Sequence, residues 1–143
     1  MKQKIILEAS IDFDYLVENC LIAALEGGSN YWYWIKADEN WYKIAKEYDR
    51  KDALKNNRIG DLSLTEKIAQ ALLNVPNFEI PIYDVEDVNE KIGLLTLPRF
   101  ELGVKLCRRD YLDVYSNMIT EQYDAGDADI LFQLAVLGGV VYG

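Results

Sequence analysis

The sequence lacks histidine entirely and has only two cysteines and three prolines among its 143 residues. Without histidine, the commonest general base is missing, and so is a favoured ligand of zinc, copper and non-haem iron. Cys20 and Cys107 each fall among apolar residues of expected helices, a setting typical of small buried side chains rather than of disulfides or reactive thiols. These shortages predict a binding protein rather than an enzyme, with no metal or other cofactor.

Long apolar runs are also missing. No apolar segment approaches the roughly 18 to 20 residues that a helix needs to cross a bilayer, and charged residues interrupt the first eight positions too early for a signal peptide. We therefore expect a cytoplasmic protein without membrane contacts. With 50% hydrophobic and 27% charged residues, the chain has a globular composition, and we expect one domain over residues 1–143.

Acidic residues outnumber basic ones, so the formal net charge is −9. Residues 36–58 hold seven basic and five acidic side chains, whereas residues 59–143 hold six basic and fourteen acidic ones. Such acidity repels nucleic-acid backbones and favours basic partners, including the grooves in which nucleic-acid enzymes hold DNA or RNA. We therefore expect no direct nucleic-acid binding; ordinary solubility charge is the alternative interpretation.

Apolar periodicity predicts a strand, a helix and a second strand at the start of the chain. Alternating apolar residues over 3–11 are typical of a half-buried strand. Over residues 12–26 the apolar positions recur at helical spacing, and Gly27 or Gly28 is expected to end that helix in the left-handed conformation. Residues 31–35 are aromatic and β-prone, which predicts a strand whose side chains alternate between its two faces.

The charged middle of the chain predicts two helices. Over residues 38–57 the charges alternate in sign, as on a solvated helix. The pairs Glu39–Lys43 and Glu47–Lys51 each have the four-residue spacing that suits an ion pair on a helix. This helix is a candidate lid or partner-binding arm. Ser63 and Glu66 have the spacing of a capping box, which predicts a helix that ends before Pro76.

A hairpin and a long helix are expected next. The strands should lie over residues 78–82 and 92–97, joined by the acidic loop 84–90. Pro81 predicts that its strand lies at a sheet edge or carries a bulge. From Thr96 onward a heptad-like apolar seam predicts one long helix, and we expect a homodimer through this helix or a sheet edge. The seam consists of Phe100, Val104, Cys107, Tyr111, Val114 and Met118.

The end of the chain predicts a short apolar helix and a last strand. Asp127 is expected to cap a helix over 130–137, which Gly138 and Gly139 close before a strand at 140–142. The acidic residues Glu121, Asp124, Asp127 and Asp129 fit helix capping and solvent exposure better than a cation site. The complete pattern predicts an α+β fold, with a small, mainly antiparallel sheet packed against helices that include one long helix.

Aromatic and arginine side chains are the candidate binding residues. The aromatic ones can serve as core, as protein interface or as platforms for nucleotide bases. The adjacent arginines favour ion pairs with neighbouring aspartates, with phosphate binding as the alternative. These candidates are Tyr31, Trp32, Trp34, Trp41, Tyr42, Arg108 and Arg109.

Two segments carry a resemblance to a known family. The segments are residues 24–34, ALEGGSNYWYW, and residues 125–143, AGDADILFQLAVLGGVVYG. They resemble the EGGxNYWY-like signature and the GxVYG-like ending of a family of small uncharacterised proteins from phages, prophages and mobile elements. The resemblance implies a bacterial host cell as the setting, and it transfers no catalytic residue.

Small acidic phage proteins without catalytic machinery are often inhibitors of host defence. The resemblance therefore implies an anti-defence protein, such as an anti-CRISPR inhibitor that occupies the nucleic-acid channel of a guided nuclease. The net charge and the aromatic residues favour this function. The alternatives are a sponge for nucleotide signals, with Trp32, Trp34 or Trp41 on the base and arginines on the phosphate, and an enzyme that uses carboxylates and a metal.

Overall fold

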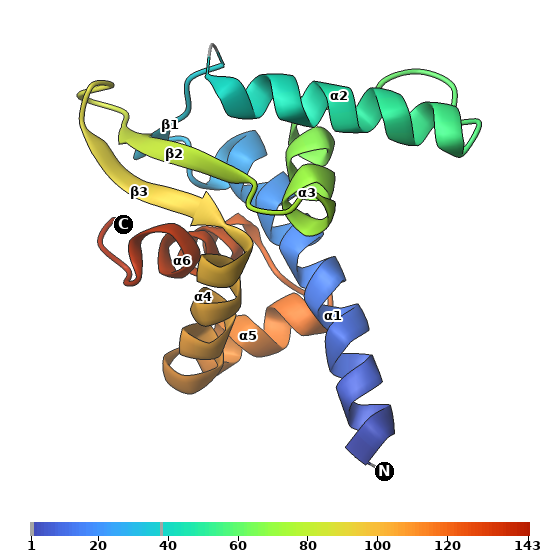
Figure 1. Ribbon diagram of the computed structural model, residues 1–143. Helices are drawn as coiled ribbons and strands as arrows, with labels where there is room; N and C mark the ends of the chain where they lie inside the picture. The colour runs from blue at the N-terminus through green and yellow to red at the C-terminus, as the bar shows by residue number, and fades with distance from the viewer. Residues whose placement is uncertain (1, 38) are drawn as a thin grey trace.

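Helices pack against a small antiparallel sheet at one side of the computed structural model, which describes residues 2–37 and 39–143 (Figure 1). The arrangement confirms the predicted α+β class. The elements are α1 (Lys2–Ala23), a π-helical turn η1 (Ala24–Gly28), β1 (Tyr33–Trp34), α2 (Asn40–Lys55), α3 (Leu64–Asn74), β2 (Glu79–Asp84), β3 (Lys91–Thr96), α4 (Leu97–Asp110), α5 (Leu112–Ile119) and α6 (Ala125–Leu137).

The sheet has the strand order β1-β2-β3, and both pairs are antiparallel. The predicted hairpin is confirmed, with Ile80 opposite Leu95. The short strand β1 pairs only with the last two residues of β2, so Pro81 has a strand neighbour on the β3 side alone. A register shift follows between Ile82 and Tyr83. The expected edge position of this strand was wrong, because β2 is the central strand, but the expected bulge is present. Since Pro81 lacks an N–H, it fits the part of β2 that has no second ladder.

The strand expected over residues 3–11 was wrong, because α1 runs without interruption from Lys2 to Ala23. A strand needs a neighbouring strand to satisfy its backbone groups, whereas extending an existing helix adds one hydrogen bond per residue. The helix predicted from residue 12 therefore continues backwards through the alternating segment.

The left-handed glycine expected at the end of α1 was also wrong. The helix ends instead in the π turn η1, which the Ser29 N–H closes with a 2.9 Å hydrogen bond to the Ala24 carbonyl oxygen. Gly28 serves close packing, since a Cβ at this position would lie 2.8 Å from the carbonyl oxygen of Ala125. Gly28 thus lets the end of the first helix approach the start of α6, whereas Gly27 meets open space.

The predicted helices in the middle of the chain are confirmed as α2 and α3. Ser63 caps α3, with its hydroxyl oxygen 3.2 Å from the Glu66 N–H. On α2 the Glu47–Lys51 ion pair forms at 3.3 Å, but Glu39 accepts a 2.7 Å hydrogen bond from the Tyr83 hydroxyl group. Figure 1 shows α2 crossing the start of α3 at the top of the view.

The expected long helix is two helices, α4 and α5, with a break at Tyr111, whose φ and ψ are −134° and 58°. Thr96 caps α4 as predicted. Phe100, Cys107 and Met118 of the apolar seam are buried in the core. Because the chain bends at Tyr111, both halves of the seam pack inside the same molecule, which a straight helix would not allow.

The core is built around α6, in which the residues from Ala128 to Val136 are buried except for half-buried Ile130. A Cβ at Gly103 of α4 would lie 2.6 Å from the Ala135 Cα, and a Cβ at Gly93 of β3 would lie 2.5 Å from the Val136 carbonyl oxygen. The absence of a side chain at these glycines lets α4 and β3 approach α6 closely. No helix within the described residues is both long enough and apolar enough to cross a membrane.

The expected last strand at 140–142 was wrong, since these residues form no strand. Gly138 ends α6 in the left-handed conformation, as predicted, with φ at 78°. The Gln133 side-chain oxygen then accepts hydrogen bonds from the Val141 and Tyr142 N–H groups, at 2.8 and 2.9 Å. A side chain thus takes the place of a neighbouring strand in binding this part of the backbone.

Candidate binding surface

A buried carboxylate joins residues 29–32 to α6. Asp129, on the first turns of α6, is only 7% exposed and accepts four side-chain hydrogen bonds. The donors are the Ser29 hydroxyl at 2.7 Å, the Tyr31 hydroxyl at 2.5 Å, the Trp32 indole N–H at 2.7 Å and the Gln133 amide at 3.0 Å. Since a buried carboxylate is stable only when its oxygens are paired, this network fixes the aromatic segment on α6.

Aromatic contacts reinforce the same junction. The Trp32 ring stacks on the Tyr142 ring with centroids 5.2 Å apart and an interplanar angle of 9°. Phe132 lies on α6 with its ring centroid 5.6 Å from that of Trp32. Segments about a hundred residues apart in the sequence therefore form one packed unit.

The acidic cluster of the sequence divides into two roles. Asp124 and Asp127 form a capping box at the start of α6, so the helix begins at Ala125, five residues earlier than expected, and Asp124 rather than Asp127 is its N-cap. The capping interpretation is confirmed for these two residues. For Asp129 the expected solvent exposure was wrong. The signal that could have identified it is its position four residues before Gln133, in a helical segment whose other residues from Ala128 to Leu137 are all apolar.

The aromatic run is divided between the core and the surface. Trp32 and Tyr33 are buried, at 1% and 8% exposure, whereas Tyr31 and Trp34 are 52% and 49% exposed. The expected strict alternation was wrong, because only Tyr33 and Trp34 are in a strand and Trp32 lies in the preceding turn. The turn directs two consecutive rings inward.

Tyr31 is held in its neutral form. Partial burial, followed by the hydrogen bond to Asp129, raises the pKa of the Tyr31 phenol to about 12. The hydroxyl group therefore remains a hydrogen-bond donor at neutral pH, and its ring is fixed while its outer face stays accessible to solvent.

The acidic β2–β3 loop lies beside the exposed rings. Trp34 is opposite Tyr83 in the sheet, and the Val85 N–H donates a 3.0 Å hydrogen bond to the Trp32 carbonyl oxygen. The carboxylates Asp84, Glu90 and Glu86 lie near enough to Tyr142 to contribute, after its burial, to the raised pKa of its phenol. We refer to Tyr31, Trp34, Asp84, Glu86 and Glu90 together as the aromatic-acidic surface.

A pocket of about 440 Å³ adjoins this surface, between the aromatic segment and the start of α3. Its polar side chains are Asn30 and Thr65, and Trp34 forms part of its wall. The remaining lining residues are Leu25, Tyr33, Ile35, Leu64, Ile68 and Val85. A mainly apolar socket with few polar groups suits an inserted apolar or aromatic side chain.

The other candidate residues lie away from this surface. Trp41 is buried on α2, where its indole N–H donates to the Lys36 carbonyl oxygen at 3.0 Å, and Tyr42 packs edge-on against its ring. On α4, Arg109 forms the expected local ion pair with Asp110 at 2.7 Å. The guanidinium of Arg108 lies 5.9 Å from the centroid of the Tyr115 ring. The structure therefore does not bring these side chains together with Tyr31 and Trp34.

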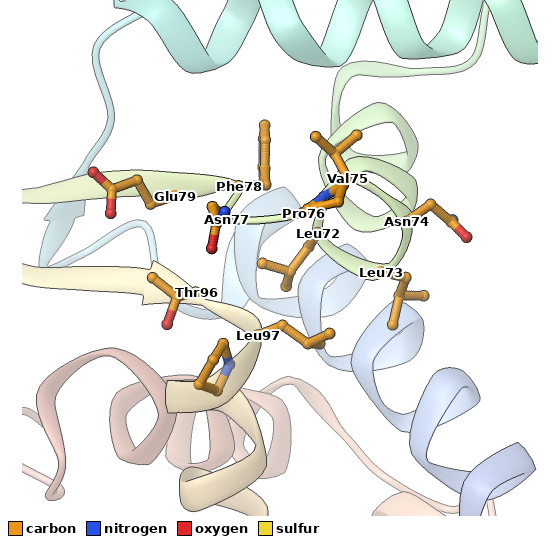
Figure 2. Close-up of a pocket in the computed structure, with 11 residues that line it drawn as sticks. Leu72, Leu73, Asn74, Val75, Pro76, Asn77, Phe78, Glu79, Thr96 and Leu97 are labelled. Carbon is orange, nitrogen blue, oxygen red and sulfur yellow. The ribbon is translucent and has the colours of Figure 1, made fainter.

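A second pocket, of about 500 Å³, lies between the end of α3 and the start of α4 (Figure 2). Figure 2 shows Leu72, Leu73 and Leu97 around it, with Glu79 at its side on β2. It contains none of the candidate residues.

Two further features bear on chemistry. Within the described residues, no group of three or more acidic or thiol side chains is placed to hold a metal ion. Cys20 and Cys107 are buried and form no disulfide, and burial raises the pKa of both thiols.

Comparison with protein-family models, curated proteins and solved structures finds no match to this chain.

Proposed function

We propose that this chain is a non-catalytic binding protein that inhibits a host defence factor, such as a CRISPR nuclease, in the cytoplasm of a bacterial host. The observation that supports it best is the aromatic-acidic surface, where half-exposed Tyr31 and Trp34 adjoin the carboxylates of the β2–β3 loop. Residues 84–91 hold four acidic side chains and one basic side chain.

The two kinds of side chain have different roles in such a complex. Rigid aromatic rings with accessible faces supply binding energy, because they bury a large area at little entropic cost. Tyr31 meets this condition through its hydrogen bond to Asp129, and Trp34 through its place in the sheet. The carboxylates steer a basic partner toward the surface and select against nucleic acid.

The experiment measures binding and cleavage by a panel of purified nucleic-acid-guided nucleases at about 50 and about 300 mM salt. Against the nuclease that binds, Trp34→Ala should weaken the complex at least tenfold (about 1.4 kcal/mol), because truncating a central aromatic anchor costs on the order of 1–4 kcal/mol. Glu86→Gln with Glu90→Gln should slow association and reduce its salt dependence.

Matched controls lie elsewhere on the molecule. Tyr15→Ala removes a 57% exposed ring from α1, and Glu101→Gln with Glu121→Gln removes two exposed charges outside the loop. Each control should bind like the unaltered protein. Equal losses in controls and test variants, or no salt-sensitive binding to any basic partner, would contradict the proposal.

We also propose a homodimer, because α4 and α5 carry exposed leucines at positions 102 and 112, which are 56% and 62% exposed, together with partly exposed Ile119. Sedimentation equilibrium should give twice the chain mass, and Leu112→Glu should give the mass of one chain. A single-chain mass for the unaltered protein at about 100 μM would rule the dimer out as a stable species.

A further inference from the structure

A pocket of about 550 Å³ between α2 and α3 has the opposite charge character to the rest of the molecule. Four basic side chains line it: Lys43, Lys46 and Arg50 come from α2, and Lys67 comes from α3. They are four of only fifteen basic residues in a chain with a net charge of −9.

Most of the negative charge in this pocket is already paired. Glu47 forms ion pairs with Lys51 at 3.3 Å and Arg50 at 3.9 Å. Asp49 is 2% exposed and is paired with Arg58, which lies outside the pocket. Asp61 is the remaining acidic side chain of the lining.

The lysines, by contrast, retain their charge unpaired. No ion pair joins Lys43, Lys46 or Lys67 to a carboxylate within the described part of the chain. Lys67 is half-buried beside the pocket, and no carboxylate of the described residues provides it with a counter-charge. An anion in the pocket would supply that counter-charge.

An aromatic ring of fixed orientation completes the pocket. Tyr42 packs edge-on against buried Trp41, with ring centroids 5.8 Å apart and an interplanar angle of 88°. The Lys46 ammonium nitrogen lies 5.3 Å from the Tyr42 ring centroid. A π-surface and ammonium groups are thus adjacent, the combination that recognises a planar base joined to phosphates.

We propose that this pocket is a binding site for a small phosphate anion, of the class of nucleoside polyphosphates. The volume is within the range of small-ligand sites, and several lysines can contact one polyanion at once. The site is independent of the aromatic-acidic surface and shares no residue with it.

Isothermal titration calorimetry with inorganic triphosphate and with ATP, both free of metal, tests the site. The unaltered protein should bind one equivalent of either anion, and affinity should fall between about 50 and about 300 mM salt. Lys43→Gln with Lys46→Gln should weaken binding at least about tenfold, because two ammonium contacts are lost. If ATP binds more tightly than triphosphate and Tyr42→Leu abolishes this difference, the Tyr42 ring contacts the base. Equal affinities would restrict the site to the phosphate chain.

The matched control is Lys55→Gln with Lys105→Gln, which removes the same charge from exposed positions on α2 and α4 outside the pocket. It should bind within about twofold of the unaltered protein, because long-range attraction between exposed charges is small. Equal weakening by the two pairs, or no heat of binding with either anion at about 1 mM, would overturn the proposal.

Discussion

Replacing Asp129 by asparagine tests whether the buried carboxylate holds the aromatic segment in place. One carboxylate oxygen accepts from Ser29 and Trp32, and the other accepts from Tyr31 and Gln133. Asparagine has nearly the same shape but offers one acceptor oxygen and one donor nitrogen. Asp129→Asn therefore changes hydrogen bonding and charge while leaving the packing volume almost unaltered.

The cost follows from which partners can reverse direction. The hydroxyl groups of Ser29 and Tyr31 can rotate and accept a hydrogen bond instead of donating one. The Trp32 indole can only donate, and the Gln133 amide is held in orientation because its oxygen already accepts from Val141 and Tyr142. If the nitrogen of the new amide takes the place of the oxygen near Trp32, it faces the indole N–H, and if it takes the place of the other oxygen, it faces the Gln133 amide N–H. Either orientation therefore leaves one buried donor facing another donor.

An unsatisfied buried donor costs about 1–3 kcal/mol, and loss of charge weakens the hydrogen bonds that remain. Part of this loss is offset because a buried charge no longer has to be desolvated. We expect Asp129→Asn to lower the free energy of unfolding by about 2–4 kcal/mol. For a domain of this size, that corresponds to a fall in Tm of roughly 5–15 °C.

Urea denaturation followed by tryptophan fluorescence measures the change, with circular dichroism as the second probe of a two-state transition. The control is Asp14→Asn, which makes the same substitution at an exposed position of α1 and should change stability by less than about 0.5 kcal/mol. If Asp129→Asn were as stable as this control, the network would not be what anchors the aromatic segment.

Three further outcomes are expected. The pKa of Tyr31 is about 12 in the folded protein and about 10 in an unfolded chain, so the neutral phenol stabilises the fold fully below about pH 10, and this stabilisation is lost as the pH rises to about 12. The Tm of Tyr31→Phe should therefore fall less than that of the unaltered protein between about pH 10 and about pH 12. An equal fall in both proteins would contradict the assignment. Gly103→Ala should lower the free energy of unfolding, measured by urea denaturation, by about 1–3 kcal/mol, because its Cβ would overlap α6. Gly139→Ala places its Cβ in open space and should leave stability nearly unchanged, so equal effects of the two substitutions would refute the close contact. Cys20 and Cys107 should resist a thiol reagent at about pH 8 until denaturant is added, since burial raises the pKa of both thiols; rapid reaction of the native protein would show an accessible thiol.

Local signals in the residue pattern were sufficient for several elements. The capping spacing of Ser63 and Glu66, the charge alternation of α2 and the hairpin around Pro81 each depend on interactions within a few residues or between adjacent strands. The aromatic segment 31–34 could also be selected as a candidate site, because four consecutive aromatic residues are visible in the sequence itself. Its division into buried and exposed rings depends on a turn that the sequence did not reveal.

Interactions between distant segments decided the rest. The alternating residues 3–11 joined a helix, and none of the strands within the described residues pairs with them. The apolar seam beyond Thr96 bent at Tyr111 because one core buries both halves. Composition and local spacing determined the α+β class, the acidity and most helix ends, since these follow from neighbouring residues. Only tertiary packing made Asp129 the anchor of residues 29–32, because its four donors come from two segments about a hundred residues apart.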